Sequence, residues 1–132
     1  HWDFQDCRHR LCLPNWENVM NEKDIHDAVD YLYTHGRKYA EAKAHRVYLE
    51  EYRKSLKSIL MKKAQADKRA TSAAAAEMEA YADNEYLQFL KGLQAATEAE
   101  EALRWGLVSA QARIDCWRSE QANNRTMDRV TM

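Results

Sequence analysis

The chain has 132 residues, a formal net charge of −1, and only three glycines and one proline. Such a length is normally one domain with a modest core, and so few turn-forming residues exclude an all-β fold. No stretch approaches the roughly 18 consecutive apolar residues of a membrane span, and the near-neutral charge by itself favours neither nucleic acid nor a membrane surface as partner.

The three cysteines are odd in number and lie far apart, which favours a reduced, cytoplasmic setting over a disulfide framework. Cys7 and Cys12 lie close to His9, but the spacing of a fourth zinc ligand is absent. We therefore expect no metal site at the cysteines.

Residues 1–19 read differently from the rest of the chain, because they show no helical period and no apolar core of a signal peptide. One interpretation is an irregular N-terminal arm that packs its tryptophans on the helices. The other is a non-native leader, with Met20 as the natural start. Asn21 or Asp24 then suits the N-cap of the first helix.

Apolar residues at steps of three or four predict one long helix from about Asp24 to Ala66, with Gly36 as the only plausible break. At 1.5 Å per residue it would measure on the order of 60 Å. A small monomer does not cover such a helix, so part of it is expected to pack on a second copy or stand exposed. The apolar positions are Ile25, Val29, Leu32 and Tyr39, and then Leu49, Tyr52, Leu56 and Ile59.

Two further helices are expected after this one. Thr71 or Ser72 suits the cap of a short helix over residues 73–82, and Asp83-Asn84 suits the start of a last helix that runs to about Gln121. The predicted fold is all-α, a long antiparallel helical hairpin over residues 20–125 with a short connecting helix. Residues 126–132 are expected to be a frayed tail.

An a/d seam runs along the last predicted helix and indicates lengthwise packing against another helix. It predicts coiled-coil-like self-association into a homo-oligomer, and its one charged member, Glu100, is of the kind that specifies register. The seam consists of Leu93, Ala96, Glu100, Leu103, Leu107, Ala110, Ile114 and Trp117. The expected interface residues are Leu93, Glu100, Leu103, Leu107, Ile114 and Trp117.

A basic block over residues 53–69 is followed by an acidic block over residues 77–101. In an antiparallel hairpin the two blocks lie near each other, so one interpretation is mutual neutralisation that helps set the register. The other is that the basic block faces outward and contacts nucleic-acid phosphates. In that case the candidate contacts are Arg46, Arg53, Lys54, Lys57, Lys62 and Lys63.

Candidate catalytic groups are sparse. Two Glu/His pairs at i, i+4 lie on one predicted helix, which is the arrangement of solvated salt bridges rather than of a di-metal bundle. Glu98 and Glu101 match half of the carboxylate motif of all-α Mg²⁺-dependent nucleotide pyrophosphohydrolases, but the second half is missing. No phosphate loop or nucleophile elbow is present. We therefore expect no enzyme, no cofactor and no metal site.

Four segments resemble small uncharacterised helical proteins encoded by tailed phages and prophages. They are residues 39–55, the stretch Glu100-Glu101-Ala102-Leu103-Arg104-Trp105, residues 110–114, and Trp117-Arg118-Ser119. The resemblance covers roughly residues 20–125 and implies a role beside phage DNA metabolism in the cytoplasm of a bacterial host.

From these observations we expect a non-enzymatic phage or prophage accessory protein that binds DNA or a DNA-processing protein. A first alternative is a structural or adaptor coiled-coil protein with no nucleic-acid role. A second alternative is an Mg²⁺-dependent all-α nucleotide hydrolase that uses Glu98 and Glu101. Salt-dependent DNA binding would favour the first of the three, and a metal-dependent thermal shift the last.

Overall fold

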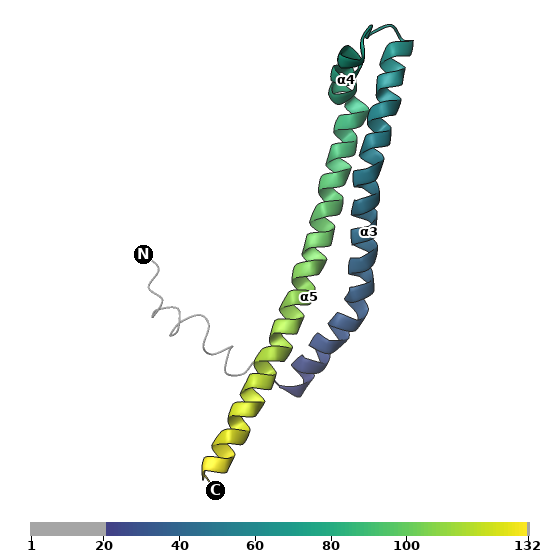
Figure 1. Cartoon of the computed structure of the whole chain (residues 1–132). Helices are drawn as coiled ribbons and strands as arrows, with labels where there is room; N and C mark the ends of the chain where they lie inside the picture. The colour runs from purple at the N-terminus through teal and green to yellow at the C-terminus, as the bar shows by residue number, and fades with distance from the viewer. Residues whose placement is uncertain (1–20, 132) are drawn as a thin grey trace, which may run out of the picture. The chain divides into compact units, whose positions relative to one another are not determined.

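The computed structural model describes residues 21–131, and three helices make up almost all of that part of the chain. Helix α3 spans Glu22–Ala66, α4 spans Ala73–Ala82 and α5 spans Asn84–Thr131 (Figure 1). No β-strand occurs within residues 21–131, so the predicted all-α class is confirmed. The interpretations of residues 1–19, including a start at Met20, lie outside the described residues.

Each helix begins at a capping side chain that the sequence provides. The Asp24 backbone N–H donates to Asn21 Oδ1 at 2.9 Å, and the Ala75 N–H donates to Ser72 Oγ at 3.1 Å. At the third helix, the Glu85 N–H donates to Asp83 Oδ1 at 2.8 Å. These bonds satisfy backbone donors that have no partner inside the helix, which is why the helices start where they do.

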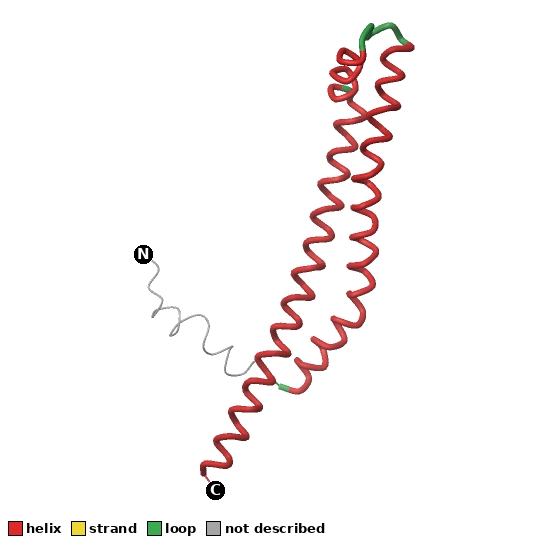
Figure 2. The backbone as a smooth tube through the Cα atoms, viewed as in Figure 1, coloured by secondary structure: helices red, strands yellow, loops and turns green. Residues whose placement is uncertain are grey.

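The end of α3 is a Schellman motif. The Arg69 N–H donates to the Ala64 carbonyl at 3.0 Å, and the Lys68 N–H donates to the Gln65 carbonyl at 3.1 Å. Lys68 has a φ of 60°, in the left-handed region that glycine usually occupies at this position. The turn that follows, over residues 67–72, separates α3 from α4 (green in Figure 2).

The predicted long first helix is confirmed. Helix α3 passes through Gly36 without a break. The expected end of the last helix near Gln121 is wrong, because α5 continues to Thr131. Residues 122–131 are exposed and have no apolar period, but they contain no proline or glycine to stop the helix.

No helix within residues 21–131 combines the length and apolar composition that a membrane crossing needs.

The chain divides into two compact units, which we call unit 1 and unit 2. Unit 2 spans Arg37–Arg104 and contains α4 together with parts of α3 and α5. Its main cluster of buried side chains combines Leu56 and Leu60 of α3 with Ala80 of α4 and Tyr86 of α5. A second cluster at the turn consists of Ala64, Ala70 and Ala76, whose small side chains allow α3 and α4 to approach closely.

Unit 1 comprises the remaining residues, of which 21–36 and 105–131 are described. Its core pairs Ala28 of α3 with Ala110 and Ile114 of α5, and the partly buried Tyr31 and Leu32 pack against them. Within each unit, contact positions on α5 move toward its start as those on α3 move toward its end. In unit 1, Ala28 packs on Ala110 and Tyr31 lies against Gly106. In unit 2, Arg46 contacts Glu100 and Tyr52 contacts Phe89. The two helices therefore run antiparallel within each unit.

Candidate interaction surface

Apart from Tyr86, every buried residue of α5 within the described part of the chain belongs to the predicted seam. In unit 2, Ala96 and Glu100 are buried while Leu93 and Leu103 are half-buried. Four further seam residues belong to unit 1: Ala110 and Ile114 are buried, and Leu107 and Trp117 are half-buried. Three seam residues contact α3 of the same chain: Ala110 and Ile114 pack on Ala28, and Glu100 pairs with Arg46. Self-association through the seam stays a prediction.

Glu100, only 5 % exposed, is the one buried charged residue within the described part of the chain. Its carboxylate accepts hydrogen bonds from Arg46 of α3, through Nε and through Nη2, the latter at 3.2 Å. Arg46 Nη1 also donates to Glu50 Oε1 at 2.8 Å. These bonds, first of all the one to Glu100, raise the pKa of the Arg46 guanidinium. Arg46 was expected among the phosphate contacts, but it is engaged here with two carboxylates inside unit 2.

Lys57 is a second member of the predicted nucleic-acid set that has an acidic partner. Its Nζ lies 2.7 Å from Glu77 Oε1 on α4 and 5.0 Å from the centre of the Tyr81 ring. The hydrogen bond to Glu77 raises the pKa of Lys57, and the same bond lowers the pKa of Glu77. Part of the basic block thus pairs with the acidic block in unit 2, as the neutralisation interpretation expects.

The other four candidates, Arg53, Lys54, Lys62 and Lys63, are exposed. Lys54 pairs with Glu51 at 3.3 Å along the helix surface. Nine positions separate Arg53 from Lys62, and nine separate Lys54 from Lys63. Nine residues make about two and a half helical turns, so each pair is half a turn apart around the helix axis. Members of each pair therefore point to opposite sides of α3, and the four do not form one basic face.

The carboxylates considered for Mg²⁺ do not gather into a metal site. Arg104 Nη2 donates to Glu101 Oε2 at 2.8 Å, and this contact raises the pKa of Arg104. Glu98 is exposed one turn earlier on α5. Within residues 21–131, no group of three or more His, Cys, Asp or Glu side chains could hold a metal ion.

Sequence reasoning missed a groove on α5 of unit 2. It has a volume of about 570 Å³ and is open to solvent, and we call it the α5 groove. Two exposed leucines, Leu87 and Leu90, lie at its N-terminal end. A second set of steps of three and four, displaced from the seam, was the available signal. The lining residues are Leu90, Leu93, Gln94, Thr97, Glu98 and Glu101.

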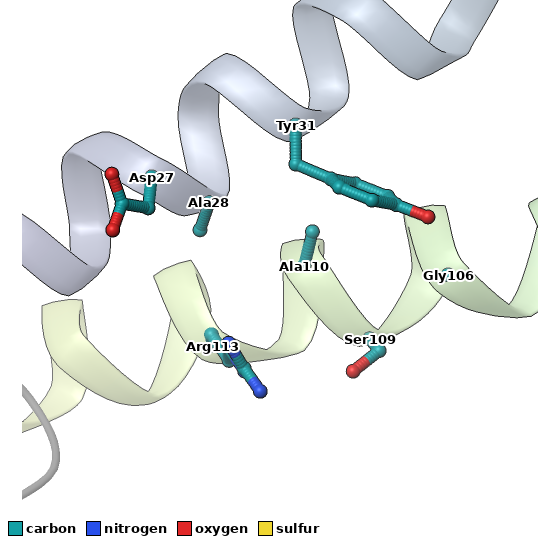
Figure 3. A pocket seen from close by; sticks show the side chains of 7 residues that line it. All are labelled: Asp27, Ala28, Tyr31, Gly106, Ser109, Ala110 and Arg113. Atoms are coloured by element: carbon teal, nitrogen blue, oxygen red, sulfur yellow. The ribbon is translucent and has the colours of Figure 1, made fainter.

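Unit 1 contains a smaller pocket of about 310 Å³ between α3 and α5. Figure 3 shows the Tyr31 side chain extending from α3 across α5 to Gly106. Asp27 of α3 and Arg113 of α5 line the same pocket but point away from each other. The Asp27 carboxylate and the Arg113 guanidinium do not point at a common position, and most of the other lining residues are small. The pocket therefore does not indicate a particular class of ligand. Its remaining lining residues are Ala28, Ser109 and Ala110.

Compared with protein-family models, with curated proteins and with solved structures, the chain matches none of them. The geometry of the described residues therefore carries the functional argument.

Proposed function

We propose that the protein is a structural or adaptor protein whose two long helices form one antiparallel helical hairpin and bind a further helix. The observation that carries this proposal is the α5 groove. It is a shallow, open depression on one face of α5, lined by two leucines and four polar residues and continued at its N-terminal end by the exposed Leu87. A helix face that combines exposed leucines with polar side chains suits an amphipathic helical partner.

This assignment is favoured over nucleic-acid binding by the positions of the basic residues. Arg46 and Lys57 already neutralise Glu100 and Glu77 within unit 2. The remaining lysines and arginine of the set diverge around α3, whereas a phosphate backbone is contacted by charges that share one face.

The test is site-specific photo-crosslinking from the groove. A benzophenone side chain placed at Gln94, inside the groove, should form adducts with a helical protein, either this chain or another one. The matched control is Gln88, also exposed on α5 but not part of the groove lining, where we expect no adduct. Equal labelling at both positions, or none at either in the cells that produce the protein, would contradict the proposal.

A second candidate function is nucleic-acid binding by an accessory protein of phage or prophage origin. The supporting observation is that Arg53, Lys62 and Lys63 are exposed and form no ion pair within the described residues. Fluorescence anisotropy with labelled single-stranded and duplex DNA tests it. Binding whose affinity falls steeply with salt, and falls again in a Lys62→Glu/Lys63→Glu variant, would support it. No binding at low salt would rule it out.

A further inference from the structure

The α5 groove has the arrangement of side chains that receives knobs from a neighbouring helix. In coiled coils, each knob inserts between four residues of the facing helix. The groove lining contains two such sets of four at positions i, i+3, i+4 and i+7, and the second set follows the first by one turn. The first set is Leu90, Leu93, Gln94 and Thr97, and the second is Gln94, Thr97, Glu98 and Glu101.

A row of candidate knobs lies on α3 of the same unit. Tyr48 and Ile59 are 64 % and 54 % exposed, and Tyr52 lies between them at the rim of the α3–α5 contact. The rings of Tyr48 and Tyr52 stack with their centres 6.1 Å apart, so they present one continuous apolar surface. Lys62 and Lys63 follow Ile59 within the next turn. We call Tyr48, Tyr52 and Ile59 the α3 ridge.

We propose that the α5 groove of one copy of this chain binds the α3 ridge of a second copy, with the two helices parallel. Ile59 of the second copy inserts among Gln94, Thr97, Glu98 and Glu101. Tyr52, seven positions earlier, then packs against Leu87 and Leu90. This inference rests on the proposed function, because it names the helix that the groove receives.

Charge and side-chain position favour a second copy in the parallel direction. Glu98 forms no ion pair within the described residues, and the same holds for Lys62 and Lys63. In the parallel arrangement these lysines lie one turn beyond Ile59, beside Glu98 of the other copy, so opposite charges meet. In the antiparallel arrangement, with Ile59 at the same site, they would lie opposite Leu93 and Gln94, about as close to Lys91 as to Glu98, and Tyr52 would lie near Arg104 instead of on the leucines.

The ridge and the groove are different surfaces, so each copy offers one of each. Two copies related by a two-fold axis can place each ridge in the other's groove and form a closed dimer. Where only one of the two contacts forms, further copies add head to tail, as a ring if the rotation between copies allows it and otherwise as a filament.

Sedimentation velocity across a concentration series tests the proposal with the full chain. We expect the wild type to self-associate as a dimer or a larger assembly. Lys62→Glu/Lys63→Glu or Glu98→Lys should weaken this association by about tenfold, since each reversal replaces attraction at exposed pairs by repulsion. A mixture of the two variants should recover assembly, because every contact between unlike copies then joins opposite charges.

Apolar variants provide a second, charge-independent measurement. Ile59→Ser should weaken association, whereas the control Val47→Ser, also exposed on α3 but outside the ridge, should not. A monomeric wild type, or a mixture of charge variants that fails to recover, would overturn docking between copies. If the groove residue Gln94 still crosslinks to another protein in that case, the adaptor function stands without self-docking. If it does not, both proposals fail.

Discussion

The three glycines of the chain lie inside helices, and one of them has a neighbour that the other two lack. Replacing a glycine in a helix interior by alanine stabilises the helix by about 1 kcal/mol. A Cβ at Gly36 or Gly92 meets no atom within 4 Å. At Gly106 it would lie 3.1 Å from Cζ of Tyr31 and closer still to the Tyr31 hydroxyl oxygen. Of the three glycines, Gly106 is therefore the one at which we expect alanine to give less than the usual gain in the free energy of unfolding.

The nearest obstructing atom is the hydroxyl at the far end of the Tyr31 side chain, which is only partly buried, so the ring can shift. We expect this shift to offset part or all of the gain of about 1 kcal/mol in helix propensity. We expect Gly92→Ala to raise the free energy of unfolding by about 1 kcal/mol, or the Tm by about 4 °C for a domain of this size. Gly106→Ala should raise it by less than Gly92→Ala does, or leave it unchanged. Urea and thermal unfolding followed by circular dichroism measure both variants.

A double variant isolates the contact with Tyr31. In a Tyr31→Ala background the obstructing ring is gone, so Gly106→Ala should stabilise as much as Gly92→Ala does. If Gly106→Ala in the wild-type background already matches Gly92→Ala, then Tyr31 does not pack over Gly106 and the reasoning is refuted.

Three further predictions concern unit 2 and its turn. Lys68→Gly relieves the left-handed backbone and should stabilise by about 1 kcal/mol in urea unfolding, whereas Lys68→Val should destabilise. Arg46→Met leaves Glu100 buried without its cation and should lower the unfolding free energy strongly, while Arg46→Met/Glu100→Leu recovers most of it; equal losses would contradict a buried pair. The Lys57–Glu77 bond should make stability pH-dependent at both extremes. Because the pKa of Glu77 is lowered, its contribution is lost as the pH falls below about 4; because that of Lys57 is raised, its contribution is lost as the pH rises above about 10. Lys57→Met should flatten both limbs of a stability–pH profile, and an unchanged profile would contradict the bond.

Local chemistry made much of the fold predictable from sequence. Ser72 Oγ accepts the hydrogen bond of the Ala75 N–H, three positions later in the chain. The capping residue and the helix start that it stabilises therefore lie within one turn of sequence. The seam likewise depends only on the helical period. The last turns of α5 were missed because their polar residues carry no period, although nothing in them stops a helix.

The partners of the charged residues were less predictable, because they depend on how far one helix is shifted along the other. Glu100 was identifiable as an unusual seam residue, but its cation, Arg46, lies 54 positions away. The α5 groove was also missed, since its polar members, Gln94 and Thr97, interrupt the apolar stripe that sequence reasoning follows.

The turn at residues 67–72 has a consequence for how unit 2 folds. The Lys57–Glu77 bond closes 20 positions of chain, and the Arg46–Glu100 bond closes 54. Once the Lys57–Glu77 bond has formed, a much shorter free length of chain has to be ordered to form the Arg46–Glu100 bond. The entropy of loop closure is therefore lost in two smaller steps. We expect unit 2 to close progressively from its turn and to fold rapidly, as chains dominated by short-range contacts do.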